Sequence, residues 1–321
     1  MSRALYQFTA CALCVLLTAC GGGGDGSEGS SSGDFVSEND VITPSTSTSA
    51  TKSRFSLRLT DAPVDDMFAV VIEVTAVALR TKAGTWINYV FPSPKSIDVL
   101  QLQGTLTADL LVDVEASLAR YDEIRLLLSD APMTNYLDLG PGGLVDLKVP
   151  GGELKIKGDF TVFNSRPTSL VIDFDLRQSI KRNGNSGKYS IKPVLRLADN
   201  ENASHLRGKV SPLLLSSASA CSDDNVDTFN ALYVYEGHDV IPDDINQNSD
   251  LDVSPFTTTI IKYHPLSSSY RYEAAFLPLG DYTIAFTCNS NLDNLDDGND
   301  DLKFFNTRNV TVTIAGKEAI L

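Results

Sequence analysis

Histidine and basic residues are scarce in this chain of 321 residues. The three histidines, His205, His238 and His264, show none of the short spacings that zinc sites and catalytic triads use. Lysine and arginine together number 26 against 41 acidic residues, a net charge of −15, and they form no basic stripe. A chain of this charge repels phosphate backbones, so the sequence argues against a zinc centre and against a nucleic-acid partner.

Long apolar runs are also missing after the N-terminus. Residues 1–19 have the pattern of a signal peptide, and residues 17–20 read Leu-Thr-Ala-Cys, a bacterial lipobox. A membrane-spanning helix needs roughly 20 apolar residues, so an uncleaved helix is the less favoured alternative. We therefore predict cleavage before Cys20 and a lipid anchor on its sulfur. Gly21 follows in place of the Asp that retains lipoproteins at the inner membrane, which favours the outer membrane.

The next segment has almost no apolar side chains. Residues 21–53 contain seven Gly, nine Ser and four Thr. Such a composition cannot bury enough surface to offset the entropy of ordering. We expect residues 20–53 to form a lipidated, disordered tether that holds the rest of the chain away from the membrane.

Cysteine is scarce as well. Of five cysteines, three remain after the predicted cleavage, and Cys20 is consumed by lipid. Cys221 and Cys288 are left in an oxidising compartment, where a structural disulfide between them is favoured over a metal-binding or catalytic thiol.

The remaining length suggests two domains, and the charge supports this division. Residues 54–200 carry 17 basic and 18 acidic side chains, whereas residues 203–321 carry seven and 17. Both halves show apolar alternation with a period of two between turn signals, and helices are few. The sequence predicts an all-β protein with two Greek-key β-sandwich domains in tandem.

Two tyrosines have the sequence context of tyrosine corners, a hallmark of such sandwiches. Tyr121 and Tyr282 each stand at the start of an apolar strand, directly after a corner. In the first half, Leu170, Ile172 and Phe174 alternate with polar residues on a strand. One such sandwich is therefore expected in each half.

The polar residues of that strand include Asp173 and Asp175. These two carboxylates could serve acid–base chemistry. A solvated sheet face, with cross-strand pairing to Lys192 and Arg196 on the returning chain, is the favoured interpretation.

Eight sequence blocks of the first half occur in an order that is typical of one family: residues 59–63, 86–87, 97–100, 121–126, 154–155, 158–162, 172–177 and 192–197. Through these blocks the chain resembles, from about Arg54 to Asp199, the bacterial family of the domain of unknown function 4382. The resemblance implies an envelope lipoprotein of unassigned activity and carries over no catalytic residue.

The second half resembles the carboxypeptidase-regulatory or prealbumin-like sandwiches, through residues 277–284. Such modules act as structural or binding appendages. The resemblance therefore implies no reaction.

Two acidic runs of the second half are candidate calcium ligands. The run at residues 244–252 places oxygen-bearing side chains at every second residue, as the start of an EF-hand loop does. The turn glycine and the final glutamate of such a loop are absent. If both runs emerge at one end of the sandwich, they could share a Ca²⁺, and plain solvation is the alternative. The candidates are Asp244, Asn246, Asn248, Asp250, Asp252, Asp293, Asp296, Asp297 and Asp300.

An aromatic segment in the first half offers a possible sugar-binding platform. Tyr89 and Phe91 fall on one face of a strand, and Trp86 falls on the other. A core position for Trp86 is the favoured interpretation.

The sequence therefore predicts a lipid-anchored cell-envelope protein that is a non-enzymatic binding or structural module. Its C-terminal domain could be calcium-stabilised, and its ligand could be a protein or a polysaccharide. The alternative is a hydrolase of envelope or extracellular polysaccharide that uses carboxylates such as Asp173 and Asp175.

Overall fold

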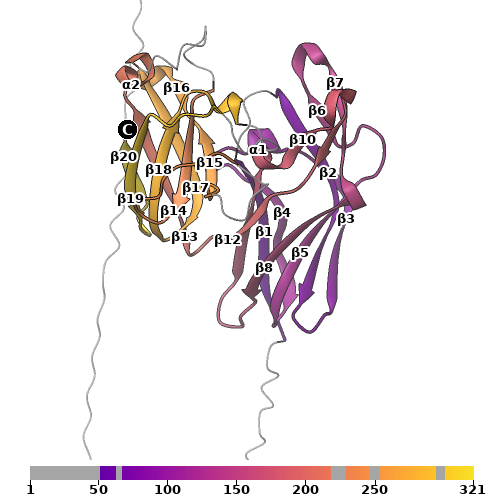
Figure 1. Ribbon diagram of the computed structural model, residues 1–321. Helices are drawn as coiled ribbons and strands as arrows, with labels where there is room; N and C mark the ends of the chain where they lie inside the picture. Colours follow the sequence, from indigo (N-terminus) through magenta and orange to yellow (C-terminus); the bar gives the residue numbers. More distant parts are fainter. Residues whose placement is uncertain (1–50, 63–66, 218–228, 246–252, 294–300) are drawn as a thin grey trace, which may run out of the picture. The chain divides into compact units, whose positions relative to one another are not determined.

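The computed structural model describes residues 51–62, 67–217, 229–245, 253–293 and 301–321, and most of them lie in strands (Figure 1). All of the described residues belong to one unit of the chain. The predicted all-β sandwich fold is confirmed. No helix among the described residues is long and apolar enough to cross a bilayer.

Strands β1–β12 form two sheets around a shared core, which we call the first sandwich. One sheet has the order β12 (Leu195–Asp199), β9 (Thr168–Asp175), β1 (Lys52–Ala62), β4 (Ala108–Ser117). The other has the order β10 (Ile180–Arg182), β11 (Tyr189–Ile191), β7 (Leu144–Lys148), β6 (Tyr136–Asp138), β2 (Ala69–Thr81), β5 (Arg120–Leu128), β8 (Glu153–Thr161), with β3 (Trp86–Asp98) paired to β2.

Strands β13–β20 form the second sandwich, with a core of its own. One sheet has the order β16 (Lys262–His264), β17 (Ser269–Pro278), β13 (Ala203–Val210), β20 (Lys317–Ile320). The other has the order β15 (Thr257–Ile260), β14 (Ala231–Glu236), β18 (Gly280–Thr287), β19 (Asn306–Val312). No sheet of the described residues combines strands from both sandwiches.

Helices are short in the described residues. The α-helices are α1 (Leu176–Ser179) and α2 (Pro212–Ser217). The 3-10 turns are η1 (Val99–Gln101), η2 (Gly140–Gly142), η3 (Pro150–Gly152), η4 (Gly184–Ser186), η5 (Pro265–Ser267) and η6 (Ser290–Leu292).

The apolar alternation builds the core of the first sandwich. Leu170, Ile172 and Phe174 are at most 3% exposed, as predicted. From the opposite sheet the ring of Tyr121 stacks on Phe160, with ring centroids 4.8 Å apart. Each large side chain that is fully buried in this way stabilises the fold by roughly 1.5–3 kcal/mol.

Both predicted tyrosine corners are present. The Tyr121 hydroxyl donates a hydrogen bond to the Ser117 carbonyl at 2.8 Å, and the Tyr282 hydroxyl donates to the Pro278 carbonyl at 2.8 Å. Each bond ties the start of a strand to the end of the preceding segment, four residues earlier. The two sandwiches therefore share the same corner device.

The prediction that Asp173 and Asp175 lie on a solvated face is wrong. Both residues are only 6% exposed. Asp173 lies directly opposite Arg196 and forms an ion pair with it, so the predicted cross-strand pair exists, but it is buried. The Arg196 guanidinium lies 4.0 Å from the centre of the Phe256 ring. Strand β9 ends at Asp175, because its carboxylate caps α1 by accepting the Gln178 amide at 3.0 Å.

Candidate binding surfaces

Trp86 does not lie in the core, contrary to the favoured interpretation. It is partly exposed on the outer face of β3. Ile87, Tyr89 and Phe91 pack against the core of the first sandwich instead. The predicted division of the aromatic residues between two faces is correct, but the face that turns inward is that of Tyr89 and Phe91.

Two guanidinium groups flank the Trp86 ring. The guanidinium carbon of Arg125 lies 4.3 Å from the ring centre, and that of Arg80 lies 5.7 Å from it. The strand register explains this arrangement. Arg80 of β2 is directly opposite Trp86, and Arg125 of β5 is directly opposite Ala78, two residues before Arg80 on β2. The indole and the two cations form one surface, which we call the Trp86 face.

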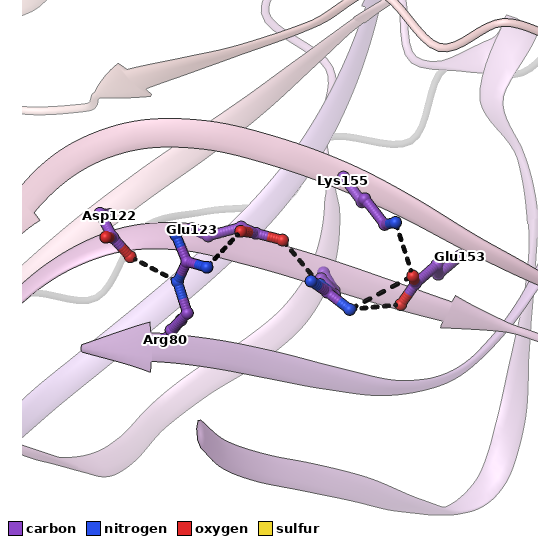
Figure 2. A network of polar contacts seen from close by, with 6 residues as sticks. Arg80, Asp122, Glu123, Glu153 and Lys155 are labelled. Carbon is purple, nitrogen blue, oxygen red and sulfur yellow. Dashed lines mark hydrogen bonds and ion pairs between the residues drawn. The ribbon is translucent and has the colours of Figure 1, made fainter. Parts of the chain in front are cut away.

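A chain of ion pairs holds these cations in place (Figure 2). Glu123 is the link, because one of its oxygens lies 3.2 Å from Arg80 and the other lies 2.6 Å from Arg125. The outer contacts are Arg80–Asp122 at 2.9 Å, Arg125–Glu153 at 3.1 Å and Lys155–Glu153 at 3.0 Å. Sequence reasoning missed this network, because only the register of β2, β5 and β8 brings its members together.

The network holds the Arg80 and Arg125 side chains beside the Trp86 ring. Glu123 is only 3% exposed, so both guanidinium groups are tied to a buried anchor. The hydrogen bond from Arg80 holds the pKa of Asp122 below its ordinary value, which keeps that carboxylate charged. Tryptophan and arginine are the residue types that most often dominate binding energy, and rigid side chains lose little entropy on binding.

A second polar group is buried in the first sandwich. Asp61, Asp173 and Asp175 are each at most 6% exposed. Burial raises the pKa of Asp175 to about 7. Burial also raises the pKa of Asp61 well above its ordinary value, and the nearby charges of Asp173 and Asp175 add to this effect. The recess that Asp61 and Asp173 line measures about 10 Å³, whereas ligand pockets occupy about 300–1,000 Å³. It offers no space for a sugar ring.

The first residues of the two acidic runs lie together at one end of the second sandwich. One carboxylate oxygen of Asp293 accepts a hydrogen bond from the Ile245 amide at 3.1 Å, and the other accepts one from the Tyr233 hydroxyl. Asp244, next to Ile245, is 7% exposed.

The other calcium candidates, Asn246, Asn248, Asp250, Asp252, Asp296, Asp297 and Asp300, lie outside the described residues. Within the described ranges, no three His, Cys, Asp or Glu side chains are grouped so that they could hold a metal ion. Cys20 and Cys221 also lie outside these ranges. Cys288 is 4% exposed, and its sulfur is not free.

A family model matches most of the first sandwich. Residues 52–193 match the family model described as a domain of unknown function, DUF4382. The resemblance drawn from the eight sequence blocks is thereby confirmed for this segment. The Trp86 face and the buried carboxylates both belong to the DUF4382 segment.

Comparison with solved structures gives only distant similarities. The Bacillus anthracis TIE protein is 9% identical over 84% of this chain, with a TM-score of 0.19, and the match spans 34% of that protein's length. The fimbrial anchor protein Mfa2 from Porphyromonas gingivalis is 11% identical, with coverages of 77% and 80% and a TM-score of 0.19. BcpA, the major pilin subunit of Bacillus cereus, is 12% identical, with coverages of 83% and 98% and a TM-score of 0.20. No curated protein matches the sequence.

Proposed function

We propose that this chain is a cell-envelope protein that is lipid-anchored at Cys20, in the outer membrane, and acts by non-covalent binding rather than catalysis. The observation that carries the proposal is the Trp86 face, where a partly exposed indole lies against two guanidinium groups. The lipobox and the tether of residues 20–53 would display this face at a distance from the membrane. A protein or a polysaccharide of the envelope is the partner.

The experiment that tests binding is a pull-down from envelope extract on immobilised chain starting at residue 21. Trp86→Ala removes the indole and leaves the two guanidinium groups without it, so we expect retention to fall roughly tenfold or more, as for an interface hot spot. Leu144→Ala is the matched control, because Leu144 is a 57% exposed apolar residue of the same sandwich, on β7. Equal retention by wild type and Trp86→Ala would refute the assigned face.

Lipid anchoring predicts a change of location. We expect Cys20→Ser to move the protein from the membrane fraction to the soluble fraction, because stable attachment requires about two acyl chains. Cys14→Ser, which changes a cysteine within the predicted signal peptide, should leave the protein in the membrane fraction. Fractionation and mass measurement of the mature N-terminus distinguish these outcomes. A Cys20→Ser protein that stays membrane-bound would contradict the proposal.

We further propose that the second sandwich is a carboxypeptidase-regulatory-like domain, stabilised by calcium and by a Cys221–Cys288 disulfide. The hydrogen bond between Ile245 and Asp293 supports the shared calcium site, because it brings the two acidic runs together. The buried and engaged sulfur of Cys288 supports the disulfide.

Calcium is expected to stabilise the second sandwich. With a dissociation constant of about 10⁻⁴–10⁻³ M, about 10 mM Ca²⁺ would add on the order of 1–3 kcal/mol relative to EDTA. Calorimetry measures this as a rise in melting temperature. Asp250→Asn with Asp252→Asn should abolish the rise, and Asp223→Asn with Asp224→Asn, which removes two acidic residues outside the candidate set, should keep it. Identical melting in calcium and in EDTA would remove calcium from the proposal.

A further inference from the structure

A groove of about 740 Å³ on the second sandwich is lined by most of the basic side chains of that sandwich. Residues 203–321 contain only seven basic side chains, and four of them line this groove: Arg207, Lys209, Lys262 and Arg271. The acidic side chains in its lining are Glu273 and Glu318. The groove is therefore positive in a half of the chain that is strongly negative overall.

Three of these cations form a row across three adjacent strands. On β16 and β17, Lys262 is directly opposite Arg271, and Arg271 is directly opposite Lys209 on β13. Like charges in directly opposite positions destabilise a sheet. Adjacent strands lie about 4.8 Å apart, so the row extends about 10 Å. The sequence tolerates two repulsive cross-strand pairs in succession at this place.

No carboxylate compensates this row. Among the described residues, none lies within ion-pair distance of Lys209, Lys262 or Arg271, whereas Arg207 is paired with Glu273 at 2.5 Å. Lys262 donates a hydrogen bond to the Gln103 side-chain carbonyl at 2.7 Å, but this amide is neutral. All three cations are exposed, so their charge is available to a ligand.

We propose that this groove binds a polysaccharide that carries carboxylate groups along its chain. A polymer with spaced carboxylates complements a single row of cations. A polyphosphate or an anionic bilayer would instead bring dense negative charge against the 17 acidic residues of the same half. The site lies on the other sandwich from the Trp86 face and does not depend on it.

The test is a titration of the chain starting at residue 21 with polygalacturonate, with neutral dextran as the uncharged polymer. We expect the triple variant Lys209→Gln, Lys262→Gln, Arg271→Gln to bind polygalacturonate at least about tenfold more weakly than wild type, because the loss of even one charged hydrogen bond costs about a factor of ten. Added salt should weaken the wild-type binding. The triple variant should melt no lower than wild type, since it loses cross-strand repulsion.

The matched control is Lys148→Gln, Lys188→Gln, Arg182→Gln, which removes three exposed cations from the first sandwich. This control should bind polygalacturonate as wild type does. The proposal would be overturned if the groove variant bound polygalacturonate as tightly as wild type, or if the control variant lost as much affinity as the groove variant. It would also be overturned if wild type bound dextran as tightly as polygalacturonate. Tighter binding of inorganic polyphosphate or of phosphatidylglycerol vesicles than of polygalacturonate would also overturn it. None of these results bears on the Trp86→Ala pull-down, so the two proposals fail separately.

Discussion

Lowering the pH from about 7.5 to about 5.5 is expected to stabilise the first sandwich against urea. The folded-state pKa of Asp175 is about 7 and that of Asp61 is raised, both mainly because the carboxyls are buried, whereas an unfolded Asp titrates near 3.8. Between these values the folded state binds more protons than the unfolded state. The stabilisation is therefore complete below the unfolded pKa and is lost as the pH rises through 7, with a size on the order of a few kcal/mol.

Asp61→Asn isolates this effect. One carboxylate oxygen of Asp61 is buried without a hydrogen-bond partner among the described residues. The variant replaces the buried carboxyl, whose ionisation the site disfavours, with an amide that cannot ionise, so we expect it to raise the free energy of unfolding by roughly 1–3 kcal/mol and to reduce the pH dependence. Urea unfolding followed by the fluorescence of Trp86, the single tryptophan, reports on this sandwich.

Asp173→Asn is the contrasting variant. It breaks the ion pair with Arg196 and leaves a mostly buried guanidinium uncompensated, so we expect a loss of about 3–5 kcal/mol. If Asp61→Asn destabilises the protein as much as Asp173→Asn does, the assignment of a raised pKa to Asp61 is refuted.

Gly208→Ala is expected to destabilise the second sandwich strongly. A Cβ atom at Gly208 would lie 1.8 Å from the backbone oxygen of Ala319 and 2.3 Å from the Tyr272 hydroxyl oxygen. These two atoms are already joined by a hydrogen bond of 3.0 Å. Strand β20, which pairs with β13 here, would have to move away. Overpacking costs about 1–3 kcal/mol and sometimes more, and the lost ladder bonds add to this.

Calorimetry checks this prediction against Gly280→Ala. A Cβ at Gly280 would meet no atom within 4 Å, and its backbone is not in the left-handed region, so this variant should melt close to wild type. If Gly208→Ala also melted like wild type, the close pairing of β13 with β20 would be wrong.

The sequence was sufficient to predict those features of the fold that depend on residues close together in the chain. The tyrosine corners at Tyr121 and Tyr282 need only residues four positions apart, and both were predictable. The core face of β9 followed from its alternation. The family resemblance was likewise carried by short blocks in order, and the match over residues 52–193 confirms it.

The candidate sites were predictable only in part, because they depend on which segments meet. Alternation on β9 implies one solvated face, and the pairing of Asp173 with Arg196 was predictable, but the contact of Arg196 with Phe256, which is distant in sequence, was not. The positive row depends on the register that aligns Lys262, Arg271 and Lys209, and no sequence pattern contains that register. The sequence shows the two acidic runs but not whether they lie at the same end of the sandwich. The hydrogen bond between Ile245 and Asp293 brings their first residues together.

The most direct measurement is photo-crosslinking in intact cells, with a photo-reactive amino acid in place of Asn88. Asn88 is exposed on β3, two residues after Trp86, and it is directly opposite Ala78 of β2. We expect a covalent adduct with an envelope component, which disappears when Trp86→Ala is added and does not form when the photo-reactive residue replaces Leu144. No adduct at Asn88 from a membrane-bound protein, or an adduct that persists unchanged in Trp86→Ala, would contradict a binding function for this face.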